Sequence, residues 1–151
     1  MLKTGILSLS FLFILTSLSY ALNKVYVSDM RIGEPNTEQD SVAVYLSIGN
    51  PSEWDAKLVK VTTVMADKAI IYVPKPGGNK GEAVEADSLT VPAGGSVALK
   101  PDGPYILLEG LKASIADIDG IELFLKFENA RNVIVTVPTR DLGKEKTPFD
   151  N

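Results

Sequence analysis

The chain has 151 residues, of which 15 are Lys or Arg and 19 are Asp or Glu, giving a net charge of −4. It contains no histidine and no cysteine, which excludes a Ser-His-Asp triad, a cysteine nucleophile, an ordinary zinc site and disulfide bonds. The acidic balance, without any basic stripe, also argues against binding to nucleic acid or to an anionic membrane surface.

The first 21 residues are typical of a secretory signal peptide. Lys3 gives a short basic start, an apolar run covers Ile6–Leu18, and Ser19 and Ala21 place small residues at the −3 and −1 positions of a cleavage site. Cleavage after Ala21 removes one charged residue and leaves a chain with a net charge of −5. A retained membrane anchor is the alternative, but the apolar run is short for a span of about 20 residues. No cysteine follows for lipid attachment.

Short apolar runs separated by turn residues follow in the first half of the mature chain. Val42–Ile48 alternates with a strict period of two, which predicts a half-buried strand, and Gly49-Asn50-Pro51 ends it. The segment Lys75–Gly81 is expected to be a flexible loop or the end of a hairpin. Further strands are expected at Val25–Val27, Leu58–Val64, Ala69–Val73, Leu89–Val91, Val97–Leu99 and Tyr105–Leu108.

The C-terminal part continues this pattern. Ile121–Phe127 alternates with a period of two, Asn129–Asn132 is a turn, and Val133–Val137 is a last strand; Leu111–Ile118 has room for one helical turn. Eight or nine short strands predict one all-β domain, an antiparallel sandwich or barrel. The expected division is a signal peptide at 1–21, the sandwich at 22–142 and a flexible charged tail at 143–151.

The most specific motif is Val91–Leu111, which reads VPAGGSVALKPDGPYILLEGL. Its PAGG, PDGP and EGL frame resembles the signature of the periplasmic copper chaperones called PCu(A)C, and a weaker likeness in strand pattern extends over about Val25–Val137. The resemblance implies a cupredoxin-like sandwich. It also implies a Cu(I) site built from a histidine, a methionine ten residues later, and a His-x-Met pair after twenty-one more residues.

Laid on this chain without a gap, the four ligand positions fall on Tyr72, Ala83, Tyr105 and Leu107. None of these side chains offers the thioether or imidazole donor that the family uses for copper. Tyrosine and leucine are close in size to the residues that they replace, so the positions form either a repacked core or a pocket for another ligand or a protein partner. The substitutions therefore argue against copper at the inherited site.

Other residues are assigned structural roles. Met30 and Met65 are the only sulfur sources after the leader, and both are expected to be ordinary core or edge residues. Glu82 and Glu85 are expected to lie on a solvated edge rather than to form a catalytic pair, and Trp54 is expected to cap one end of the sandwich.

The sequence thus predicts a periplasmic or secreted protein like the PCu(A)C copper chaperones that is not an enzyme. The resemblance implies an accessory role in copper handling or respiratory oxidase assembly, with a periplasmic partner such as an oxidase assembly factor. No cofactor is expected, since copper is implied only by the resemblance, and no membrane span is expected after cleavage. The alternative is a non-metal binding or interaction module that uses the same sandwich.

Overall fold

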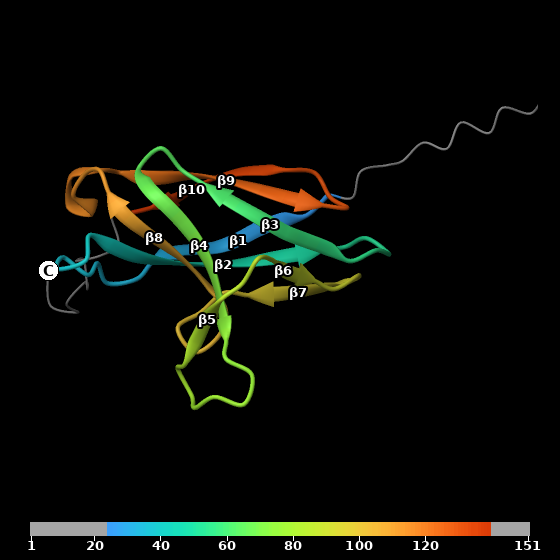
Figure 1. Ribbon diagram of the computed structural model, residues 1–151. Coiled ribbons are helices and arrows are strands. Elements are labelled where there is room, and N and C mark those ends of the chain that lie inside the picture. Colours follow the sequence, from blue (N-terminus) through green and yellow to red (C-terminus); the bar gives the residue numbers. More distant parts are fainter. Residues whose placement is uncertain (1–23, 140–151) are drawn as a thin grey trace, which may run out of the picture.

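The computed structural model describes residues 24–139, which form two antiparallel sheets packed face to face (Figure 1). The larger sheet contains β1 (Tyr26–Ile32), β2 (Ser41–Asn50), β4 (Ala66–Pro74), β5 (Ala83–Glu85), β7 (Gly95–Ala98) and β8 (Tyr105–Leu111). The smaller sheet contains β3 (Ala56–Thr62), β6 (Leu89–Val91), β9 (Gly120–Glu128) and β10 (Val133–Pro138). The predicted all-β, cupredoxin-like sandwich is confirmed.

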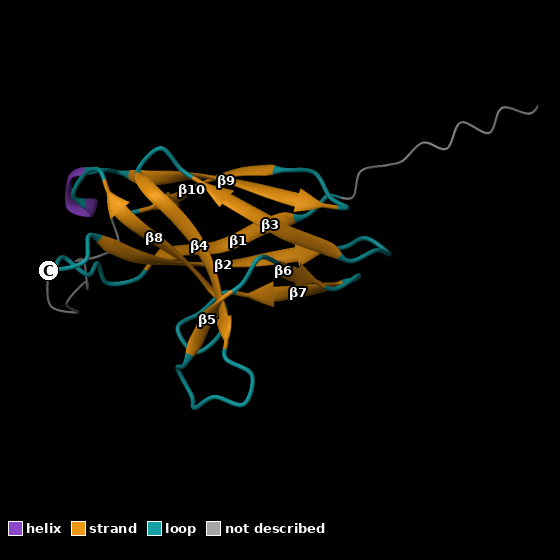
Figure 2. Ribbon diagram, in the orientation of Figure 1, coloured by secondary structure: helices purple, strands orange, loops and turns teal. Residues whose placement is uncertain are grey.

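The strand order explains which residues become neighbours. In the larger sheet it is β1-β2-β8-β4-β5, with β7 also paired to β2; in the smaller sheet it is β10-β9-β3-β6. The expected helical turn is a 3₁₀ helix, η1 (Ile115–Asp117), which is the purple segment in Figure 2. Within residues 24–139 no helix has the length and apolar character needed to cross a membrane.

The core lies between the two sheets and follows from the period-two alternation of the strands. On β8, Ile106 and Leu108 are fully buried, whereas Tyr105 and Leu107 are half-buried and face away from the core. The same alternation buries Leu123 and Leu125 on β9. Each of these large side chains contributes about 1.5–3 kcal/mol of transfer free energy when fully buried. We call the side of the larger sheet that faces away from the core its outer face.

The PAGG motif forms the corner at which the chain passes from the smaller sheet to the larger one. It connects β6 to β7, and the amide of Gly95 donates to the carbonyl of Pro92 at 3.1 Å to close a turn. Gly94 has a φ of +65°, a region that favours glycine. The buried side chain of Asn50 holds this corner, because its Nδ2 donates to the carbonyls of Trp54 and Val91 at 2.8 and 3.1 Å.

The PDGP motif is a loop that leaves the larger sheet and returns to it. Strand β7 pairs with the C-terminal half of β2 and β8 with its N-terminal half, so β7 and β8 lie along the same side of β2. Between them, the amide of Lys100 donates to the carbonyl of Pro104 at 2.8 Å, and that of Gly103 to Lys100 at 3.0 Å. Tyr105 is the first residue after this loop.

Three features differ from the sequence-based expectation or lie outside the described residues. Strand β5 was not predicted; it pairs with β4 across the Lys75–Gly81 loop, a hairpin that projects from the molecule in Figure 1. Trp54 does not cap the sandwich, since the residue is 70% exposed. The signal peptide and the domain boundaries at residues 21 and 142 fall outside the described residues and remain predictions.

Candidate functional site

The four positions matched to the copper motif lie together at one end of the larger sheet. Tyr72 on β4 is directly opposite Tyr105 on β8, and Leu107 is two residues further along β8 on the same face. Ala83 opens β5, where it pairs with Pro74, two residues from Tyr72. Four residues that are separated by up to 35 positions in the sequence therefore share one region of the outer face.

Tyr72 and Tyr105 pack against each other as a stacked pair. Their ring centroids are 5.2 Å apart and their planes differ by 7°. Both side chains are half-buried, and burial raises the pKa of the Tyr105 phenol, with Tyr72 and Tyr45 as smaller contributions. The Tyr105 phenol thus stays protonated at neutral pH, and the two stacked rings cover β4 and β8 with aromatic surface.

A third tyrosine extends this aromatic surface, and sequence reasoning missed it. Tyr45 on β2 follows Val44, which pairs with Ile106, so it lies next to Tyr105 on the neighbouring strand. The guanidinium of Arg31 on β1 lies over the Tyr45 ring at 5.2 Å from its centroid. The outward positions of β2 in the period-two pattern were the available signal, because they place Tyr45 on the same face as Tyr105.

All four tyrosines of the described residues lie on this outer face. Tyr26 on β1 is opposite Gly49, and a Cβ atom at Gly49 would lie 2.1 Å from the Tyr26 ring, so the ring packs over the glycine backbone. The outer face therefore presents aromatic side chains from β1, β2, β4 and β8. Clustered tyrosines of this kind, with an apolar body and a polar tip, are typical of interaction surfaces.

The residues at the inherited positions do not fit Cu(I). This ion prefers thioether, thiolate or imidazole donors, whereas the positions carry two phenols, a methyl group and an isobutyl group. Met30 and Met65 are partly buried and pack against the core, as predicted, so they do not supply sulfur to this face. Residues 24–139 also hold no cluster of three His, Cys, Asp or Glu side chains that could bind a metal.

The acidic residues beside Ala83 have a structural role. The Nζ of Lys75 lies 3.5 Å from Oε2 of Glu82, and the side chain of Asn79 donates to Oε1 at 3.2 Å. Hydrogen bonds from Asn79, and then from Lys75, lower the pKa of Glu82. Glu85 is exposed on the edge strand β5. These contacts fix the hairpin end and agree with the predicted solvated edge.

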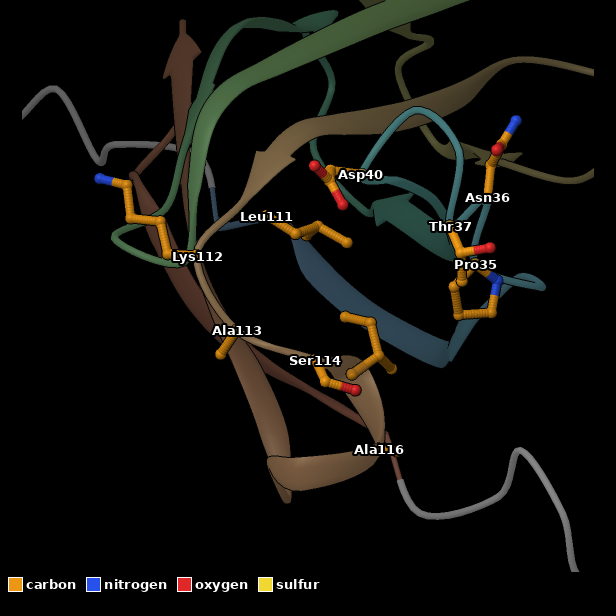
Figure 3. Close-up of a pocket in the computed structure, with 10 residues that line it drawn as sticks. Pro35, Asn36, Thr37, Asp40, Leu111, Lys112, Ala113, Ser114 and Ala116 are labelled. Carbon is orange, nitrogen blue, oxygen red and sulfur yellow. The ribbon is translucent and has the colours of Figure 1, made fainter.

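A cleft of about 480 Å³ lies between the β1–β2 loop and the segment that joins β8 to η1. Figure 3 shows Pro35 and Leu111 on its two sides, with the Lys112 side chain directed away from it. Lys112 instead lies 3.6 Å from the carboxylate of Asp67. Ser114 is the hydroxyl beside η1, and the chain offers no imidazole to activate it. The cleft therefore lacks the parts of a nucleophilic site.

Solved structures of copper-chaperone domains share this fold. The apo PCuAC domain from PmoF1 matches with a TM-score of 0.64 and 25% identity, covering 79% of this chain and 95% of that domain. The apo form of DR1885 from Deinococcus radiodurans matches with a TM-score of 0.54 and 27% identity, covering 78% of each chain. The copper-bound PCuAC domain from PmoF2 matches with a TM-score of 0.65 at 17% identity, covering 79% and 94%.

These likenesses confirm the resemblance to the PCu(A)C copper chaperones. The search of curated proteins finds no relative. The family model described as "Putative lipoprotein LpqE-like" matches residues 25–139, which include every strand of the sandwich. The chain belongs to the LpqE-like family and has the fold of the PCuAC copper-chaperone domains.

Proposed function

We propose that this chain is an extracytoplasmic accessory protein that acts through a protein contact on its outer face and does not carry copper at the inherited positions. The observation that carries the proposal is the stacked pair of Tyr72 and Tyr105, which puts two packed aromatic rings in the place of two ligands. Any part in copper handling or oxidase assembly would then depend on a partner that binds this face. On this proposal the protein is not an enzyme.

Three observations support the location and the mode of action. Residues 1–21 have the pattern of a signal peptide, and the family description names a lipoprotein, which is an exported class. The chain has no cysteine to carry a lipid, so the proposal is a processed, unanchored protein. Tyrosine is enriched among the residues that dominate protein interfaces, and here four tyrosines lie on one sheet face.

A Cu(I) competition experiment tests the proposal. The processed protein, purified from the periplasm of an expression host, is titrated against a colorimetric Cu(I) chelator beside the variant with Tyr72→His, Ala83→Met, Tyr105→His and Leu107→Met. We expect the native protein to leave the chelator fully loaded and the variant to withdraw about one equivalent, because the variant restores four soft donors on a matching scaffold.

A matched control separates a restored site from scattered donors. The variant with Tyr26→His, Val64→Met, Phe124→Met and Ile134→His places the same four donors at exposed positions, and we expect it to compete no better than the native protein. If the native protein itself withdraws one equivalent of Cu(I), the proposal is wrong. The Met30→Leu and Met65→Leu variants would then show whether a methionine supplies the ligand.

A further inference from the structure

The outer face contains a groove that includes Tyr105 and Leu107 of the copper motif and extends beyond the four motif positions. It has a volume of about 330 Å³ and runs over β2 and β8. Tyr45 and Tyr105 form its two walls, and Ala43 and Leu107, which pair with each other across the strands, form its floor. We call this feature the tyrosine groove. Tyr72 is not part of its lining, since that ring lies behind Tyr105.

The groove is open because its two walls lean in opposite directions. The Tyr45 ring leans towards β1, since a Cβ atom at Gly33 would lie 3.0 Å from its Cε2, and Arg31 covers the ring at 5.2 Å. The Tyr105 ring leans towards β4, where it stacks on Tyr72 at 5.2 Å. Each wall is therefore supported from behind, which makes the groove a preformed site that needs little ordering on binding.

The rim of the groove carries uncompensated negative charge at one end. Glu34, Asn36 and Gln39 of the β1–β2 loop line that end. Residues 34–40 contain three acids and no basic residue, and no acid of this loop has an ion-pair partner within the described residues. At the other end, beside Gly81 and Pro101, Lys80 is paired with Asp102 at 3.3 Å. The field along the groove thus favours a cation at the Glu34 end.

We propose that the tyrosine groove binds an arginine side chain carried on an extended segment of a partner protein. A guanidinium is planar and stacks on aromatic faces while it donates to a carboxylate such as that of Glu34. The packing of Arg31 over the Tyr45 ring shows the same kind of contact made within the chain. The net charge, −4 for the full chain and −5 after the expected cleavage, adds long-range attraction for a basic segment. This inference rests on the proposed protein contact at the outer face and names its chemistry.

The test uses the processed protein in a buffer with a copper chelator. The probe is the fluorescein-labelled peptide Gly-Ser-Gly-Arg-Gly-Arg-Gly-Ser-Gly, compared with the same peptide carrying glutamine for both arginines, and binding is read by anisotropy. We expect saturable binding of the arginine peptide only. Tyr105→Ala should weaken it by about 10-fold, as for loss of one desolvated cation–π wall. Phe124→Ala removes an exposed aromatic side chain of the smaller sheet, outside the groove, and should change the affinity by less than about 2-fold.

Charge reversal gives a second readout that does not depend on the core. Glu34→Lys and Glu38→Lys change exposed residues of one loop and alter the net charge equally, but only Glu34 lines the groove. We expect Glu34→Lys to weaken binding by about 10-fold and Glu38→Lys by no more than about 3-fold. If Tyr105→Ala fails to fold, this pair still decides the question.

Several outcomes would overturn the inference. They are the absence of saturable binding at about 1 mM peptide, equal binding of the glutamine peptide, or equal effects of Glu34→Lys and Glu38→Lys. Another is binding of a neutral oligosaccharide such as maltohexaose, seen as shifts of the Tyr45 and Tyr105 ring resonances, without any response to the arginine peptide. Because copper is chelated throughout, this result is independent of the Cu(I) competition, so the two proposals can fail separately.

Discussion

The side chain of Asn50 makes four hydrogen bonds in the corner between the two sheets. It is fully buried at the end of β2. Its amide nitrogen donates to the carbonyls of Trp54 and Val91, and its oxygen accepts from the amide and the hydroxyl of Ser52 at 3.2 and 2.6 Å. Asn50→Ala removes all four hydrogen bonds at once without adding volume to the core.

The loss of unfolding free energy in Asn50→Ala depends on which of the former hydrogen-bond partners of Asn50 water can reach. The Val91 residue is fully buried, so its carbonyl loses a partner that water replaces poorly, at a cost of about 1–3 kcal/mol. Trp54 is exposed and Ser52 is half-buried, so water can compensate their lost bonds in large part. We therefore expect Asn50→Ala to lower the free energy of unfolding by about 2 kcal/mol.

Urea unfolding followed by far-ultraviolet circular dichroism measures this loss. With a slope of roughly 1–2 kcal/mol per molar for a domain of this size, the midpoint should fall by about 1–2 M. Asn79→Ala is the matched control, because Asn79 is exposed and bonds only within the β4–β5 hairpin; it should cost less than about 0.5 kcal/mol. If both variants lose the same small amount of unfolding free energy, the corner does not depend on Asn50 and the reasoning is refuted.

Two further predictions concern β8. Gly110→Ala should lower the free energy of unfolding by more than Gly94→Ala does in the same urea assay. Both glycines have a positive φ, but only at Gly110 would a Cβ atom meet another residue, Asp67, at 2.6 Å. Equal losses of free energy would show that the contact with Asp67 does not matter. Burial raises the pKa of Tyr105, so the folded state binds this proton more tightly than the unfolded state does. The free energy of unfolding therefore does not change with this group near neutral pH, and it falls as pH rises above the unfolded pKa of about 10. Tyr105→Phe should reduce this alkaline loss in unfolding midpoints taken across that range, and an unchanged pH profile would contradict the assignment.

The strands that were predicted well are those with a clear apolar alternation. Val42–Ile48 and Ile121–Phe127 lie within β2 and β9, because a half-buried strand must place every second side chain in the core. Strand β5 was missed since Ala83–Glu85 has only three residues and forms an edge that packs little apolar surface. Its pairing with β4 depends on the turn and on the Glu82 contacts, which leave no periodic signal.

The sequence named four positions for a candidate site, but it did not reveal how they are arranged. The spacing named Tyr72 and Tyr105 separately, and only the pairing of β4 with β8 makes them a stacked pair. Tyr45 was not named at all, because its closeness to Tyr105 depends on sheet order, which the sequence does not encode locally. The cap assigned to Trp54 was wrong for a related reason: its carbonyl is held by Asn50, while the indole itself remains in solvent.

The division of β8 into a buried side and an outward side has a consequence for how such a protein can change. Ile106 and Leu108 hold the two sheets together, whereas Tyr105 and Leu107 contribute little to the packing between them. Substitutions on the outward side can therefore accumulate without much loss of folding free energy. During evolution, substitutions at a few positions can replace a metal site by an aromatic surface, or restore the metal site, while the fold stays the same. The same independence makes this sandwich a practical starting point for building new binding sites.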